Sequence, residues 1–83
     1  MALERGRVVI SKSGRDKDYY MVVVFSSDGF ADVANGKLRR ISQPKRKNAK
    51  HLALTNTLLD EAVFENDKRL REAIIKSFGA ERR

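Results

Sequence analysis

Basic side chains without any acidic neighbour are concentrated between residues 37 and 51. They are Lys37, Arg39, Arg40, Lys45, Arg46, Lys47 and Lys50. Basic and acidic residues balance in segments 1–36 and 52–83, so this stretch accounts for the whole formal charge of +7. A merely soluble surface mixes both signs of charge. A cationic surface of this purity indicates a polyanionic partner, and nucleic acid is the commonest polyanion in a cell.

Residues that could support catalysis or hold a metal are few. His51 is the only histidine, and the chain has no cysteine. A lone histidine beside Leu52 is more typical of packing, or of an RNA contact at the end of the basic stretch, than of a catalytic base. No spacing of potential ligands is typical of a metal site, and no glycine-rich phosphate loop is present. We therefore expect no enzyme activity, no cofactor and no metal.

The length of 83 residues allows one small domain with a modest core. The longest apolar run, Tyr19 to Phe25, is far shorter than the roughly 20 residues of a membrane-spanning helix. Charged residues at positions 4, 5 and 7 interrupt any signal-peptide pattern at the N-terminus. We expect a soluble cytoplasmic protein without a membrane partner.

Short β-branched and aromatic runs predict strands over the first two-thirds of the chain. Val8 to Ile10 is the first run. The second, 19–25, is apolar throughout, which is typical of a central strand covered on both faces or curling round a small barrel. A fifth short strand is predicted at 51–54.

A hairpin is predicted in the middle of the chain. Asn35-Gly36 lies between the strand-like segments 30–34 and 37–41, which is a strong signal for a type I′ turn. In that register, Asp32 lies opposite Arg39 on the solvent face. Pro44 then ends the strand, and residues 45–50 are predicted to form an exposed basic loop.

The last third of the chain has helical periodicity. Residues 55–65 fit either a short helix or an extended segment. Asn66 or Asp67 can cap a helix at about 67–78, whose apolar stripe is Leu70, Ile74 and Phe78, and Gly79 provides a stop. We expect this stripe to pack on the strands, with binding to a partner protein or a second copy as the alternative.

The order of residues from 6 to 52 resembles a known family. Gly6 to Lys17 resembles the KOW motif, with a first strand, a loop glycine and a basic approach to the second strand. The segments 33–36 (VANG), 38–40 (LRR), 44–47 (PKRK) and 50–52 (KHL) are similar to small bacterial KOW-domain RNA-binding proteins, which are related to KOW-containing ribosomal proteins of the large subunit. The resemblance covers residues 5–54 and leaves 55–83 as a C-terminal extension of the single domain 1–83. One departure is Asp18, where a KOW loop often has glycine after its lysine.

The resemblance implies a mainly β (α+β overall) fold, a small SH3-like β-barrel of about five short strands, here with a C-terminal α-helix. It also implies binding of structured, usually ribosomal, RNA, and hence a ribosome-associated or translation-related factor. Gly14 would supply the special geometry of the first loop. With the basic stretch, the expected RNA-binding residues are Lys12, Arg15, Lys17, Arg39, Arg40, Lys45, Arg46, Lys47, Lys50 and His51.

The mode of binding is predicted from the aromatic residues. Tyr19, Tyr20, Phe25 and Phe30 lie in strand-like runs, where they are expected to be core or half-buried. Recognition of folded RNA by its shape and backbone is therefore favoured over base stacking. The alternative function is a non-enzymatic protein-interaction adaptor, which the absence of tryptophan and the cationic stretch disfavour. A ribosomal or other protein partner could also bind the C-terminal helix.

Overall fold

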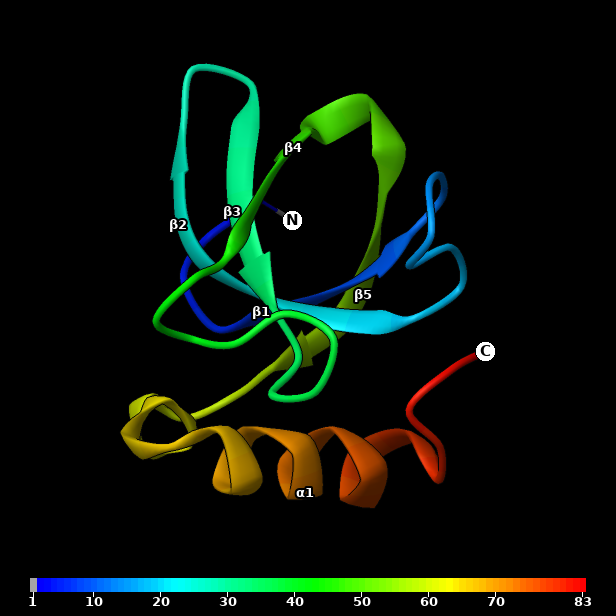
Figure 1. Cartoon of the computed structure of the whole chain (residues 1–83). Coiled ribbons are helices and arrows are strands. Elements are labelled where there is room, and N and C mark those ends of the chain that lie inside the picture. Colours follow the sequence, from blue (N-terminus) through cyan, green and yellow to red (C-terminus); the bar gives the residue numbers. More distant parts are fainter. Residues whose placement is uncertain (1) are drawn as a thin grey trace.

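The computed structural model describes residues 2–83, which form a five-stranded antiparallel sheet and one C-terminal helix (Figure 1). The strand order is β4-β3-β2-β1-β5, so β4 and β5 are the two edges of a curled sheet that is not closed. The strands are β1 (Arg7–Ser11), β2 (Tyr20–Ser27), β3 (Phe30–Ala34), β4 (Lys45–Asn48) and β5 (Leu52–Leu58). Two 3₁₀ helices (Ala49–His51 and Glu61–Glu65) and the helix α1 (Asp67–Phe78) complete the fold. The mainly β architecture with a C-terminal helix is as predicted.

Strand β2 is the centre of the sheet. Its first half pairs with β1 and its second half with β3, and Val22 pairs with both. The register with β3 shifts at Val24, which forms a β-bulge. As its apolar sequence predicts, β2 is covered on both faces, by one cluster of side chains inside the curl and by another beneath the helix.

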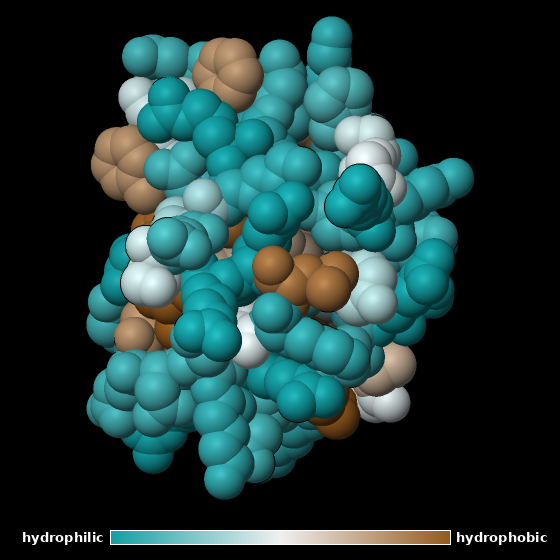
Figure 2. All heavy atoms as spheres, in the orientation of Figure 1, coloured by the Kyte–Doolittle hydropathy of each residue, from teal (hydrophilic) through white to brown (hydrophobic). Residues whose placement is uncertain are grey.

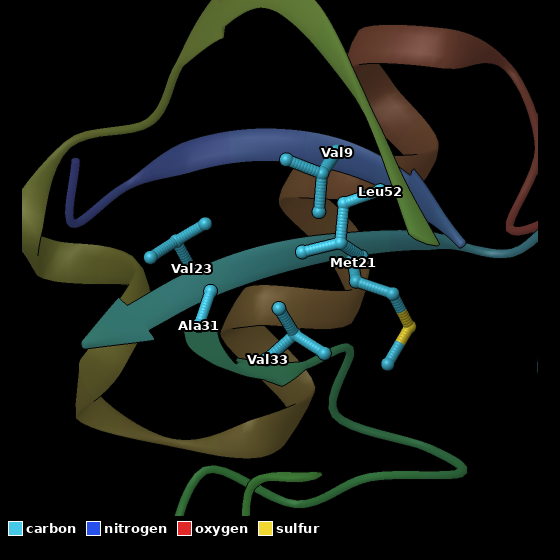
Figure 3. Close-up of a cluster of buried hydrophobic side chains, with 6 residues drawn as sticks. All are labelled: Val9, Met21, Val23, Ala31, Val33 and Leu52. Carbon is cyan, nitrogen blue, oxygen red and sulfur yellow. The ribbon is translucent and has the colours of Figure 1, made fainter. Parts of the chain in front are cut away.

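The inner cluster fills the concave face of the sheet. Side chains from all strands except β4 point toward one another there (Figure 3). They are Val9, Met21, Val23, Ala31, Val33 and Leu52. Apart from Leu52, each is at most 1% exposed. The alternation of β-branched residues along the strands produces this face, because successive side chains point to opposite sides.

The helix α1 covers the outer face of β2 and β3. Its buried residues Leu70 and Ile74 pack in one cluster with Val22 and Ala34, and the Phe78 ring stacks on that of Tyr20. The expected packing of the apolar stripe on the strands is therefore confirmed. So are the bounds of the helix.

Both ends of α1 are capped as the sequence predicts. The Asn66 side chain accepts a hydrogen bond from the Arg69 N–H at 2.8 Å, and Gly79 ends the helix with φ of 75°. Residues 55–65 combine both expectations, since β5 extends to Leu58 and a 3₁₀ helix follows at Glu61–Glu65.

The predicted hairpin after Asn35-Gly36 is wrong. Gly36 has φ of 81° but Asn35 does not have a positive φ, and residues 37–41 form bends and a turn instead of a strand. The Asn35 side chain organises this loop by accepting hydrogen bonds from the N–H groups of Lys37 and Arg39, both at 3.0 Å. Strand β3 pairs with β4 instead, so Asp32 faces Arg46 and not Arg39.

The physical reason is that the loop after β3 also contacts the start of α1. A Cβ atom on Gly36 would overlap the Asp67 carbonyl oxygen. In addition, the Ile41 N–H donates to the Asp67 carboxylate at 2.8 Å. A tight two-residue turn would remove these contacts with the helix.

The predicted basic loop at 45–50 is also wrong. Residues 45–48 are the edge strand β4, and a 3₁₀ helix follows at 49–51. Asn48 caps this short helix by accepting a hydrogen bond from the Lys50 N–H at 3.1 Å. The basic residues therefore alternate between the two faces of a strand.

Candidate nucleic-acid interface

The loop between β1 and β2 has the backbone geometry expected of it. Gly14 adopts φ of 80°, as predicted, and Asp18 adopts φ of 71°. Aspartate is one of the few non-glycine residues that tolerate this left-handed region. The Asp18 N–H donates to the Ser11 carbonyl oxygen at 2.7 Å, which closes the loop at its base. Asp18 thus takes the backbone conformation for which a glycine would be suited.

A buried ion pair lies under this loop. Lys47 points inward from β4, and its Nζ lies 2.8 Å from the Asp16 Oδ1 atom. The same ammonium donates to the Ser11 hydroxyl at 2.8 Å and to the Ser13 carbonyl oxygen at 2.9 Å. Lys47 is 7% exposed and Asp16 1% exposed. The expectation that Lys47 is an exposed RNA contact is therefore wrong, because all of its donors are used inside the protein.

The pKa of Asp16 reflects two opposed effects. Burial by itself raises the pKa, because it disfavours the charged carboxylate. The hydrogen bonds from Lys47 and Ser11 lower the pKa, as do the charges of Lys47 and Lys45. The lowering effects prevail, so the pKa of Asp16 lies below its ordinary value and its carboxyl group is ionised at neutral pH.

Exposed cations surround the loop above this pair. The Lys12 N–H donates to the His51 carbonyl oxygen at 2.8 Å, which brings the end of the 3₁₀ helix beside the loop. Arg15 and Arg39 line one hollow of about 250 Å³ together with Asp16 and Leu38. The loop at 12–17 therefore contacts two other basic segments of the chain, residues 38–39 through Arg15 and Asp16, and residue 51 through Lys12.

The C-terminal residues join the same end. The Arg83 N–H donates to the Asp18 carbonyl oxygen at 2.8 Å. The Arg82 guanidinium lies 5.4 Å from the centre of the Tyr19 ring. Figure 1 shows the C-terminus on the same side as the loop between β1 and β2. Sequence analysis missed these two arginines because the segment 52–83 is electrically balanced as a whole.

Most of the expected RNA-binding cations form no ion pair with an acidic residue among residues 2–83. These cations are Lys12, Arg15, Lys17, Arg39, Arg40, Lys45 and Lys50. Arg46 differs, because it lies on the other face of β4 and pairs with Asp32 at 3.2 Å. His51 is exposed. A phosphate group at the loop between β1 and β2 would therefore meet unpaired donors from Lys12, Arg15 and Lys17 in the loop and from Arg39 beside it.

The four aromatic residues considered as possible base contacts fall into two groups. Tyr19 and Tyr20 are half-buried, as predicted. Phe25 and Phe30, however, are 57% and 41% exposed, so the expectation that they are core or half-buried is wrong. Figure 2 shows hydrophobic side chains standing out from a hydrophilic surface over the hairpin of β2 and β3.

Other kinds of site have little support in the described part of the chain. Residues 2–83 contain no group of three histidine, cysteine or acidic side chains placed to hold a metal ion. None of the helices described is long and apolar enough to cross a membrane. Neither protein-family models nor curated protein sequences match this chain.

Proposed function

We propose that this protein is a non-enzymatic RNA-binding module that contacts structured RNA mainly through phosphates. The observation that carries the proposal is the gathering of unpaired cations around the loop between β1 and β2. Arg15 and Arg39 line one hollow there, and the backbone N–H of Lys12 donates a hydrogen bond to the His51 carbonyl oxygen. Electrostatic contacts of this kind supply most of the affinity of non-specific nucleic-acid binding.

The fold supports an SH3-like barrel of the KOW type as part of the same proposal. Five short antiparallel strands curl around one inner cluster, and the loop glycine Gly14 has the positive φ that a KOW loop requires. The order of the KOW-like segments in the sequence supports ribosomal RNA as the ligand. We therefore propose a cytoplasmic factor that associates with the ribosome or acts in translation.

A protein partner through α1 receives less support. The apolar stripe of the helix is used on the sheet, where Leu70 and Ile74 are buried. The large apolar side chain that the helix exposes is Ile75, which is 38% exposed. It lines a hollow of about 380 Å³ together with Gly36 and Arg71. Such a partner would bind beside the RNA surface and not in place of it.

The proposal is tested by the salt dependence of RNA binding. If about five cations release counterions, log K falls against log salt with a slope of roughly −3.5 to −4.5. Fluorescence anisotropy with a labelled ribosomal RNA hairpin between low and moderate salt measures this slope. A flat response, or no binding at low salt, contradicts the proposal. Nucleic acid that co-purifies before a high-salt wash raises the 260/280 nm absorbance ratio and gives an independent check.

Crosslinking in cells identifies the RNA. Ultraviolet crosslinking followed by sequencing is expected to recover ribosomal RNA. A variant with Lys12, Arg15 and Lys17 changed to glutamine tests the site, because these residues are exposed and their side chains make no hydrogen bond within residues 2–83. Equal recovery of RNA by this variant would contradict the proposed site.

A further inference from the structure

The outer face of β2, β3 and β4 is only partly covered by α1. Val22 and Ala34 lie opposite each other and are buried beneath the helix. Farther along the same face, Phe25 lies opposite Asp32, and Phe30 lies opposite Ser27. Directly opposed residues share a face of a sheet, so both phenylalanines lie on the uncovered end of this surface.

The bulge at Val24 places Phe25 on that surface. Met21 and Val23 point into the inner cluster, so a regular strand would send Phe25 inward as well. The register shift between Val23 and Phe25 reverses the alternation and turns the ring outward. Bulges of this kind commonly redirect a side chain next to a functional site. The exposure of this ring is therefore a consequence of a specific backbone feature.

The surroundings of the two rings are polar and carry both signs of charge, because Asp32 lies opposite Phe25 and Asp28 lies in the turn of the hairpin. Arg46 lies opposite Asp32 on β4, in the same row as Phe25, and its side chain is 65% exposed. The Ala49 N–H donates to the Gly29 carbonyl oxygen at 2.8 Å, which brings Lys50 beside the tip of the hairpin. Two rings among polar residues form too small an apolar area for the buried centre of a stable protein interface.

We propose that Phe25 and Phe30 form a stacking platform for unpaired nucleobases, with Arg46 and Lys50 placed to contact the adjoining phosphates. This inference rests on the proposed RNA-binding function and adds a second contact surface to it. Aromatic side chains provide flat faces on which unpaired bases stack, and any of the bases can stack there because each has an aromatic face. The RNA would then combine a structured part at the basic loop end with a single-stranded loop or end on the platform.

The first test compares two RNAs with one set of variants. The RNAs are a hairpin with an unpaired loop and a duplex of similar length, titrated at the same salt concentration. The variant F25A/F30A is expected to lower affinity for the looped RNA at least about tenfold, and affinity for the duplex less than about twofold. Leu54→Ala is the matched control, because Leu54 is 39% exposed on β5, away from the platform.

The second test reports stacking directly. The chain has no tryptophan, so Phe25→Trp places the only tryptophan at the platform, where it can be excited selectively over the two tyrosines. Its emission is expected to be quenched by the looped RNA and to stay unchanged with the duplex. The variant Phe25→Leu keeps an apolar side chain but removes the ring, and it is expected to weaken looped-RNA binding as Phe25→Ala does.

The outcomes separate the two proposals. Wild-type RNA affinity of F25A/F30A together with unquenched emission would overturn the platform while leaving the RNA-binding function in place. If the wild-type chain self-associates or binds a protein and F25A/F30A does not, while RNA binding is unchanged, this face is a protein interface. Absence of any salt-sensitive RNA binding by the wild-type chain would overturn both proposals.

Discussion

Positive charge is used in opposite ways in two layers at the same end of the molecule. In the interior, Lys47 is enclosed and gives its hydrogen bonds to Asp16, Ser11 and Ser13. On the surface above, Lys12 and Arg15 are exposed, and no acidic residue among positions 2–83 pairs with them. The sign of the charge is the same in both layers, but the buried layer supports the loop and the exposed layer is free to bind.

The interior ion pair of Lys47 and Asp16 holds the loop that carries the exposed cations. The Lys47 ammonium reaches the Ser13 carbonyl oxygen, and Asp16 belongs to the same loop as Lys12 and Arg15. The ion pair therefore links strand β4 to the loop between β1 and β2. Changes in the two layers should separate stability from RNA affinity, and the following predictions use this difference.

The largest effect is expected from Lys47→Met. The substitution leaves the Asp16 carboxylate buried without its counter-charge, which typically costs about 3–5 kcal/mol of the free energy of unfolding. Urea denaturation at pH 7 measures this loss. Lys50→Met is the matched control, because Lys50 is exposed and its loss should change stability by no more than about 0.5 kcal/mol.

A double variant distinguishes the ion pair from simple loss of packing. Asp16→Asn combined with Lys47→Met removes both charges, and replacing both members of a buried pair is often nearly neutral. The double variant is therefore expected to be more stable than Lys47→Met alone. If it is less stable, the unpaired charge is not the cause of the loss.

Acid pH should also reduce the stability that the ion pair of Asp16 and Lys47 provides, by less than Lys47→Met does. The pKa of Asp16 in the folded protein lies below its ordinary value. A carboxyl group of this kind stabilises the protein above its unfolded pKa, and the contribution is lost as the pH falls through the folded pKa. The melting temperature should therefore decrease when the pH is lowered to less than about 4. Asp16→Asn should make the melting temperature depend less on pH in this range.

A second carboxyl group requires a control in this experiment. The hydrogen bond from Arg71 lowers the pKa of Glu81, and Lys37 lowers it further. Glu81→Gln is expected to change the acid dependence less than Asp16→Asn, because Glu81 is more exposed than Asp16. A larger effect of Glu81→Gln would place the pH-sensitive contact at the C-terminal tail.

Gly14→Val tests the link between the two layers. Gly14 has φ of 80°, which is strained for a β-branched residue. We expect a cost of about 1–3 kcal/mol and weaker RNA binding, because the loop would no longer hold Lys12 and Arg15 in place. Thermal melts and a titration at fixed salt measure the two effects. Wild-type values in both would show that the loop geometry does not position the cations.

The smallest effect on stability is expected from the surface layer. Changing Arg15 and Lys17 to glutamine should alter the free energy of unfolding by less than about 0.5 kcal/mol per site, while RNA affinity falls roughly tenfold through lost phosphate contacts. Changing Lys68 and Lys76 on α1 removes the same charge and is the matched control. Equal losses of affinity in the two double variants would indicate that net charge, and not the loop site, determines binding.

The fold could be predicted where local signals and packing agree. The helix has its predicted bounds because Asn66, Gly79 and the stripe of Leu70 and Ile74 all specify the same element. The hairpin was mispredicted because Asn35-Gly36 satisfies a local turn pattern, whereas contacts with Asp67, distant in sequence, determine the loop. Non-local contacts of this kind leave no periodic signal.

The candidate site was predictable in composition but not in geometry. Charge alone identified the basic stretch, and the resemblance identified Gly14. Neither could show that Lys47 is buried, because that depends on β4 pairing with β3 and on Asp16 facing it from another loop. The exposure of Phe25 depends on a bulge at Val24, which shifts the alternation by one residue without a change in the hydrophobic pattern.

Strand β2 also has a consequence for how the molecule opens. Val22 pairs with both Val8 and Ala34, and β2 is buried on both faces, so two neighbouring strands and two side-chain clusters shield its central amides. Hydrogen exchange at the central β2 amides should therefore require global unfolding, with protection close to the full unfolding free energy. The edge strands β4 and β5 should exchange by smaller, local openings. The molecule would then fold as one cooperative unit in which a single strand couples the loop end to the helix.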